Sequence, residues 1–149
     1  MRIKLSVSGE HYEEIEKDLK KIGIEIDDDA ELILSERDAY SDFLAVKSSE
    51  GERFHIPVEE IVSIESYGHS VEVHTQKDSY FADERLYQLC ALLDPEKFVR
   101  VSNSSIVARN KIRSIKPMLS MKFVLLMSDG NSIDVTRSYY NIFKEYIGI

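Results

Sequence analysis

From residue 43 onward the sequence consists of short extended segments that follow one another at close intervals. Eight stretches, each four to nine residues long, combine β-branched, aromatic and other apolar residues in the way that strands do. So many short strands within about a hundred residues favour antiparallel pairing over a sheet with crossover helices. The predicted strands are residues 43–47, 54–58, 61–65, 71–75, 98–102, 111–115, 119–127 and 132–135.

Turn sequences and two helical patterns separate these strands. Glycine-containing turns are expected at Ser49–Glu52, Tyr67–His69 and Ser128–Asn131, the last being a strong hairpin signal. One helix is expected to start at Asp83 as its N-cap and to stop at Asp94-Pro95, and the other to run from near Thr136 to Gly148. Their apolar residues are interpreted as core contacts: Leu86, Leu89, Cys90 and Leu93 in the first helix, and Tyr139, Ile142, Phe143, Tyr146 and Ile147 in the second. Cys90 is predicted to be a small core residue and not a nucleophile.

The first 42 residues follow a different pattern. Ile3, Leu5 and Val7 alternate as in a strand, and apolar residues at helical spacing then lead to Gly23. Two more extended pieces, 24–26 and 32–34, flank the acidic run 27–29. We expect a small α+β, βαβ-like segment, too short to be a phosphoacceptor receiver domain, with 27–29 as a solvated turn. The helical stripe, expected to be buried within the chain or at a dimer contact, is Tyr12, Ile15, Leu19 and Ile22.

The net charge of −8 conceals a strong asymmetry along the chain. Residues 1–50 carry 7 basic and 14 acidic side chains, whereas residues 51–149 carry 12 and 13. From Lys97 to Lys122 there are seven basic side chains and no acidic one. This segment is either a candidate anion-binding surface or an ordinary solvated face.

Several classes of protein find no support in the sequence. The single cysteine suggests a reducing cytoplasm, and no apolar run approaches the roughly 18 residues of a membrane span. The six glycines form no phosphate-binding loop, and the four histidines lack zinc-ligand spacing. A hydrolase using His69 or His74 would rest on no motif, and no helix-turn-helix is present. We therefore expect a protein without catalytic activity, cofactor or metal.

Three segments, in order, carry a resemblance to a known family. They are Pro57–Glu65 followed by Tyr67–His74, then Phe98–Val107 leading into Asn110–Ile112, then Asp129–Tyr139. Together they resemble the LytTR DNA-binding domain, the output module of many bacterial transcription regulators, over about residues 43–149. The resemblance implies a mainly β, elongated antiparallel fold with two short helices, whose loops enter the major groove of DNA.

The resemblance also implies which residues touch DNA. The family's contacting loops correspond here to His69, Asn103 and Arg137, and their side chains suit base edges or phosphates. Each has an ordinary alternative: an idle loop residue for His69, a turn cap for Asn103 and an ion pair with Asp134 for Arg137. Sequence-independent phosphate contacts are expected from Arg100, Arg109, Lys111, Arg113 and Lys116.

The sequence thus predicts a cytoplasmic, sequence-specific regulator that binds double-stranded DNA. Residues 43–149 would form the DNA-binding domain, and residues 1–42 a short α+β segment whose role the sequence does not assign, a homodimer contact and a docking site for another protein being the two candidates. Because this segment is too short for a receiver, control by aspartyl phosphorylation is not expected. The alternative is a protein-interaction module whose acidic N-terminus docks a partner or masks the basic loops.

Overall fold

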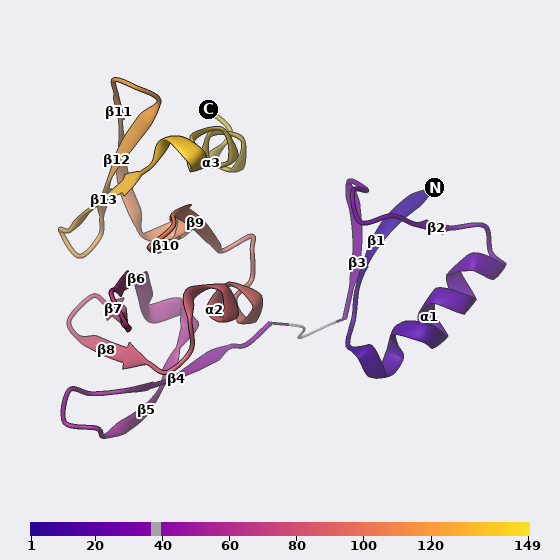
Figure 1. Cartoon of the computed structure of the whole chain (residues 1–149), viewed down its shortest axis with the longest axis horizontal. Helices are drawn as coiled ribbons and strands as arrows, with labels where there is room; N and C mark the ends of the chain where they lie inside the picture. The colour runs from indigo at the N-terminus through magenta and orange to yellow at the C-terminus, as the bar shows by residue number, and fades with distance from the viewer. Residues whose placement is uncertain (37–39) are drawn as a thin grey trace. The chain divides into compact units, whose positions relative to one another are not determined.

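The computed structural model describes residues 1–36 and 40–149, and the chain divides into two compact units (Figure 1). Unit 1 is Met1–Ala39 and unit 2 is Tyr40–Ile149. The boundary predicted from the sequence, between residues 42 and 43, falls three residues further along the chain. The fold class predicted from the sequence, antiparallel β preceded by a small α+β segment, is confirmed.

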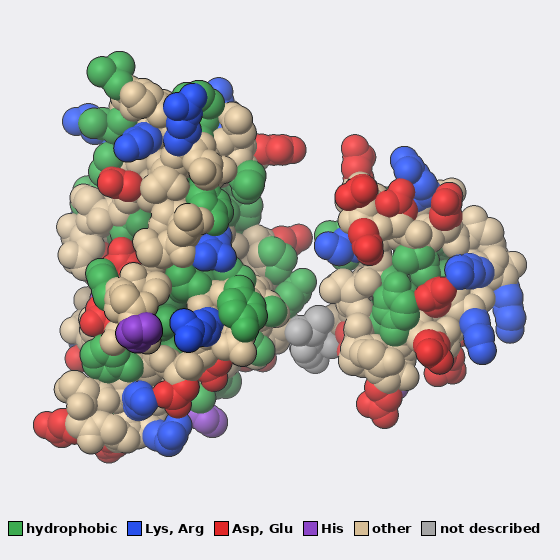
Figure 2. Space-filling model, in the orientation of Figure 1, with side chains coloured by type: hydrophobic (Ala, Val, Ile, Leu, Met, Phe, Trp, Pro, Cys, Tyr) green, Lys and Arg blue, Asp and Glu red, His purple; other side chains and the backbone are tan. Residues whose placement is uncertain are grey.

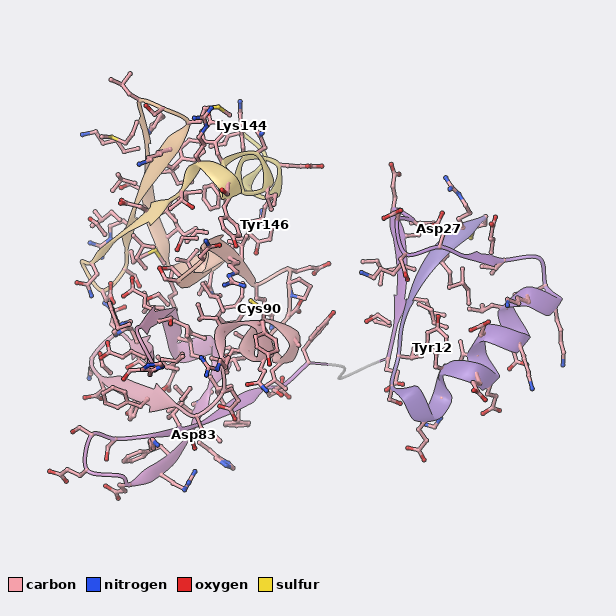
Figure 3. All side chains as sticks on the ribbon, viewed as in Figure 1. Tyr12, Asp27, Asp83, Cys90, Lys144 and Tyr146 are labelled. Atoms are coloured by element: carbon pink, nitrogen blue, oxygen red, sulfur yellow. The ribbon has the colours of Figure 1, made fainter. Side chains whose placement is uncertain are left out.

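Unit 1 is a βαβ arrangement with a third strand. Strand β1 (Arg2–Ser6) lies between β2 (Glu25–Ile26) and β3 (Leu32–Ser35), and it pairs with both in parallel. Helix α1 (Gly9–Lys21) lies beside this sheet, with Tyr12 between helix and sheet (Figures 1 and 3). The predicted alternation in β1 is confirmed, since Ile3 and Leu5 are buried.

The apolar stripe of α1 is only half-buried in this chain, contrary to the expectation of burial within the chain, and the alternative of burial at a dimer contact stays a prediction. Tyr12, Ile15 and Leu19 are each partly exposed, and no residue of α1 is fully buried. Ile22 is 71% exposed because the helix ends before it, at Lys21. A two-residue β2 and a four-residue β3 provide too narrow a sheet to cover a helix of 13 residues.

Unit 2 contains ten strands in two sheets, and every neighbouring pair is antiparallel. The larger sheet has the order β5-β4-β8-β7-β6-β10-β9 and the smaller one β11-β12-β13 (Figure 1). The strands are β4 (Phe43–Lys47), β5 (Arg53–Pro57), β6 (Ile61–Tyr67), β7 (Ser70–Thr75), β8 (Ser79–Ala82), β9 (Phe98–Ser102), β10 (Ser105–Ala108), β11 (Ile112–Met118), β12 (Lys122–Met127) and β13 (Ser132–Val135).

Two strands were not predicted, and three predicted strands were too long. The missing strands are β8 and β10, both four residues long. Val58 and Lys111 belong to short 3₁₀ turns, η1 (Val58–Glu60) and η2 (Arg109–Lys111), and not to strands. Residues 119–121 form the β11–β12 hairpin turn, where the backbone enters the left-handed region at residues 120 and 121. The mostly apolar stretch 119–127 does not reveal where such a turn interrupts it.

The two helices of unit 2 differ at their starts from the prediction. Helix α2 (Leu86–Leu92) has Arg85 as its N-cap residue, and the side-chain oxygen of Gln88 accepts a hydrogen bond from the Arg85 backbone N–H at 2.9 Å. Asp83, the predicted N-cap, is thus not the cap. Its carboxylate instead pairs with Lys47 at 2.7 Å (Figure 3 labels Asp83). Helix α3 (Tyr140–Ile147) follows the 3₁₀ turn η3 (Arg137–Tyr139) and ends at Gly148 with φ of 83°, as predicted.

Unit 2 has two hydrophobic cores that share strands. In β10, Ile106 and Ala108 face the first core while Val107 faces the second, because successive side chains point to opposite faces of a strand. Strand β6 does the same with Ile61 and Val62. The first core lies against α2 and includes Cys90 at its margin, where burial raises the pKa of the thiol. The second core is closed by β12, β13 and Phe143 of α3.

Candidate nucleic-acid interface

Three loops of unit 2 meet because the register of the strands brings them to one end of the larger sheet. Strand β10 pairs with β6 so that Ser105 lies opposite Glu65, and the Ser66 N–H donates to the Ser104 carbonyl at 2.8 Å. The β6–β7 turn and the β9–β10 turn are thus neighbours. The Thr136 N–H donates to the Val101 carbonyl at 3.0 Å, which brings the segment after β13 to the same place.

The first loop is a two-residue hairpin turn that presents His69. Tyr67 and Ser70 are paired across it, with Gly68 and His69 as the central residues. Gly68 has a φ of 61°, which a residue with a Cβ adopts at a cost, and hairpin turns favour such a residue at this place. The exposed His69 follows it at the tip.

The second loop presents Asn103 and is held from within by Arg100. The Arg100 guanidinium donates to the Ser102 carbonyl at 3.1 Å and to the Asn103 carbonyl at 2.7 Å. Ser102 also accepts a bond from the Ser104 backbone N–H at 3.1 Å. Arg100, expected as a phosphate contact, is half-buried, and two of its N–H groups bind the backbone of this loop.

The third loop presents Arg137 at the start of the turn η3 and is joined to the second loop through Tyr139. The Tyr139 hydroxyl donates to the Oδ1 atom of Asn103 at 3.0 Å. Arg137 itself is exposed, and no ion pair with Asp134 is found among the described residues.

Asn103 lines two concave surfaces. One hollow also contains His69 and Arg100 from the predicted set, together with Arg85 and Tyr87 from the start of α2. The other hollow also contains Arg137, together with Lys122 and five serines, among them Ser104 and Ser138. Four of the eight predicted residues, His69, Arg100, Asn103 and Arg137, are therefore brought together here.

Two acidic residues at this surface already have partners within the protein. Asp83, in the first hollow, pairs with Lys47, and this hydrogen bond holds the pKa of the Asp83 carboxyl below its usual range. Glu65, in the second hollow, accepts a hydrogen bond from the Tyr67 hydroxyl and lies 3.3 Å from Nε2 of His74. The Glu65 hydrogen bond raises the pKa of Tyr67 to about 12. These partners reduce the repulsion that the acids would exert on an approaching phosphate.

The other four predicted residues lie outside the two hollows. Arg109 and Lys111 line a separate hollow with Glu59 and Glu96, and the Arg109 guanidinium lies 5.3 Å from the ring centre of Tyr146 (Figure 3 labels Tyr146). The other two lie on the exposed strand β11: Arg113, which donates to the Ser128 carbonyl at 3.3 Å, and Lys116.

Sequence reasoning did not single out several residues at this surface. They are Arg85 and Tyr87, Ser104 and Ser138, and Tyr139, which was assigned to the core. The basic run 97–122 could have pointed to Lys122 as a residue of this surface. The hydrogen bond between Tyr139 and Asn103 has no local signature in the sequence, because the two residues are far apart along the chain. No helix among the described residues has the length and apolar character that crossing a membrane requires.

Comparison with known proteins gives consistent matches. A family model described as the LytTr DNA-binding domain matches residues 51–148. The sensory transduction protein LytT of Enterococcus faecalis is 28% identical over 86 residues, which cover 53% of this chain and 36% of that protein. The transcriptional regulatory protein YpdB of Escherichia coli K12 is 29% identical over 90 residues, which cover 60% of this chain and 37% of that protein. The match thus spans little more than a third of each of these relatives.

A solved structure has the same fold. It is described as the LytTr DNA-binding domain of a methyl-accepting/DNA response regulator from Bacillus cereus. The superposition has a TM-score of 0.70 with 24% sequence identity, and it covers 73% of this chain and 99% of the other. At this identity the likeness concerns the fold alone.

Proposed function

The chain belongs to the LytTR family of DNA-binding domains, and from this premise we propose that it is a sequence-specific transcription regulator. Its partner is double-stranded DNA, which the loops at His69, Asn103 and Arg137 contact in the major groove. The chain binds DNA in this role and carries out no catalytic step. The names of its relatives, a sensory transduction protein and a transcriptional regulatory protein, agree with this role.

One observation carries the proposal: three loops, separated in the sequence, present polar side chains side by side at one end of unit 2. Asn103 borders both hollows, with His69 in one and Arg137 in the other. Imidazole, amide and guanidinium groups can all donate to the acceptors on base edges, and a guanidinium can bind guanine through two bonds. A row of such donors, two on hairpin turns and one on the turn η3, suits a groove whose walls are lined by acceptors and phosphates.

The basic residues outside the hollows supply the part of the affinity that does not depend on sequence. Arg113 and Lys116 on β11, and Arg109 and Lys111 on η2, are proposed to approach the phosphate backbone on either side of the loops. Each phosphate contact releases a condensed counterion, so affinity falls as salt rises. Arg100 contributes by holding the Asn103 loop.

The proposal is tested by titrating labelled duplexes, one selected from a random pool and one of random sequence. We expect Arg137→Ala or His69→Ala to weaken binding to the selected duplex by about 1–3 kcal/mol, and binding to the random duplex much less. Lys144→Ala is the matched control, because Lys144 lies on α3, 5.8 Å from the ring centre of Tyr140, and lines neither hollow (Figure 3). Folded His69, Asn103 and Arg137 variants that all keep wild-type affinity for both duplexes would refute the assignment.

A second function is proposed for unit 1, where β3 favours a contact with another protein chain. Leu32, Ile33 and Leu34 are 56%, 61% and 41% exposed, and β3 is an edge strand. Exposed apolar edge strands are templates for pairing. Antiparallel pairing of two copies about Ile33 would place Leu32 opposite Leu34 and Glu31 opposite Ser35, without facing like charges directly. A homodimer through β3 is therefore self-complementary.

Sedimentation equilibrium tests this second function. We expect the full chain to form a dimer and Ile33→Glu to remain a monomer, since a charge would then face its own copy. The exposed substitution Lys17→Glu on α1 is the control, and it should leave the dimer intact. A full chain that stays monomeric at all concentrations would exclude self-pairing, and DNA binding by unit 2 would remain unaffected.

A further inference from the structure

We propose that Tyr139 is a positioning residue that fixes which way round the side-chain amide of Asn103 faces DNA. An asparagine amide has an acceptor oxygen on one side and an amino donor on the other, so its orientation decides which base edges it can read. The inference rests on the function proposed above, because it concerns the base-reading role of Asn103.

The Tyr139 hydroxyl is held in place by the tertiary structure. The Tyr139 backbone N–H donates to the Thr136 carbonyl at 2.9 Å, and the Thr136 N–H in turn donates to the Val101 carbonyl of β9 at 3.0 Å. The Tyr139 ring is partly buried and packs against the second core. Its hydroxyl therefore has a fixed position relative to the loop that follows β9.

The backbone of Asn103 is held from the other side. Arg100 donates to the Asn103 carbonyl at 2.7 Å and to the Ser102 carbonyl at 3.1 Å. With the backbone fixed, the side chain keeps two torsions, and the terminal one, which turns the amide, has two nearly equivalent orientations. The structure has the orientation in which the Tyr139 hydroxyl donates to Oδ1 at 3.0 Å. In this orientation the oxygen faces Tyr139 and the amino group faces away from it.

This orientation predicts the kind of base edge that Asn103 recognises. The amino group offers donors, which pair with N7 and O6 of guanine or O4 of thymine in the major groove. The amino group of cytosine is itself a donor, so it cannot accept a hydrogen bond from the amino group of Asn103. Pairing with adenine through two bonds would need the one remaining lone pair of Oδ1 as well as the amino group. Asn103 is thus better suited to a base edge made of acceptors.

The test compares Tyr139→Phe with Tyr146→Phe as a matched control. Tyr146 lies on α3, packs on the same core and donates its hydroxyl to the Glu96 carbonyl at 2.8 Å, so its loss removes a similar bond away from Asn103. Asn103→Ala first identifies the base pair whose preference depends on Asn103. Binding is then measured with all four bases at that position and with random DNA.

We expect the wild type to favour guanine or thymine there by about 5-fold to 100-fold, which corresponds to one good base contact. Tyr139→Phe should reduce this preference to about 3-fold or less, while affinity for random DNA stays within about 2-fold. In Asn103→Ala, adding Tyr139→Phe should cause no further loss of preference, because Tyr139 acts through Asn103. Tyr146→Phe should keep the wild-type preference.

A second variant keeps the test decisive if Tyr139→Phe fails to fold. Asn103→Asp retains an oxygen for the Tyr139 hydroxyl and lacks the amino donors, so it should fold and lose the preference. A wild-type preference for adenine or cytosine at that base pair, or an undiminished preference in Asn103→Asp or in folded Tyr139→Phe, overturns the inference alone. No change of preference in Asn103→Ala overturns the inference together with the assignment of Asn103 to the DNA site.

Discussion

Unit 1 and unit 2 are stabilised to very different extents by their interiors. Among the described residues, the buried apolar side chains of unit 1 are Ile3 and Leu5, whereas unit 2 has two extensive cores. A segment of fewer than about 40 residues buries too little surface for high stability. Unit 2 therefore has the packed interior that can hold its loops in fixed positions, while unit 1 is a small unit with little interior.

The two regions also differ in charge. Residues 1–50 carry twice as many acidic as basic side chains, whereas every charged side chain in residues 97–122 is basic. Figure 2 shows acidic side chains gathered over unit 1, and Lys and Arg side chains at the end of unit 2 that holds the β11–β12 hairpin. The net charge of the whole chain thus describes neither region, and a negative total is compatible with DNA binding.

The contrast in packing predicts the largest effect. Phe143 is fully buried in the second core, with its ring centre 5.6 Å from that of Phe123. We expect Phe143→Ala to lower the free energy of unfolding of unit 2 by about 3–5 kcal/mol, measured by urea denaturation. Leu5→Ala in unit 1 should leave the unfolding midpoint of unit 2 unchanged. A loss below about 1 kcal/mol for Phe143→Ala would contradict the comparison.

The contrast in charge predicts a smaller effect on DNA binding. Arg113→Ala or Lys116→Ala should weaken binding to all sequences about equally, because a phosphate contact carries no sequence information. The slope of log affinity against log salt should fall in magnitude by about 0.9 per lost contact. Lys17→Ala in unit 1 is the control and should leave the slope unchanged. Titrations at several salt concentrations would reject the assignment if both β11 variants kept the wild-type slope.

A pH effect confined to unit 1 would sharpen the comparison further. The Ser8 backbone N–H and hydroxyl donate to Oε1 of Glu36 at 2.8 Å and 3.0 Å, and these bonds hold the pKa of Glu36 below its usual range. A lowered pKa in the folded state stabilises unit 1 above the usual glutamate pKa of about 4.3, and this contribution is lost as the pH falls through the lower value.

We therefore expect exchange protection of the α1 amides to fall in acid, and the fall to be smaller in Glu36→Gln. Hydrogen exchange followed by NMR measures both units in one sample. The amides of β6 and β10 in unit 2 serve as the internal reference. An equal acid dependence in the wild type and in Glu36→Gln would show that the Ser8 bonds do not stabilise unit 1.

The smallest effect is expected on removing unit 1 altogether. Residues 43–149 contain all ten strands and both cores of unit 2. We expect this fragment to fold and to bind DNA as a monomer, with an intrinsic affinity within a few-fold of the full chain. Circular dichroism and duplex titration would check this. An unfolded fragment would mean that the two units depend on each other.

Much of the fold was predictable because it follows from local patterns. The strands 43–47, 98–102 and 132–135 begin and end where predicted, and Gly68, Gly130 and Gly148 adopt the positive φ that their turns and caps need. Strand β10 was missed because it is buried on both faces, so its residues do not alternate between apolar and polar. Asp83 was misassigned because its partner, Lys47, is 36 residues away.

The sequence by itself determined the antiparallel β class, the turns, the charge division and, through the family motifs, the three loops. Only the tertiary structure decided that β6 and β10 align so that His69 and Asn103 lie together, that Arg100 holds a loop, and that Tyr139 bonds to Asn103. The physical reason is how far apart along the sequence the interacting residues lie. Turns, caps and alternation depend on neighbours within a few residues, whereas a hydrogen bond across 36 residues exists only after strand register and two shared cores have fixed both ends.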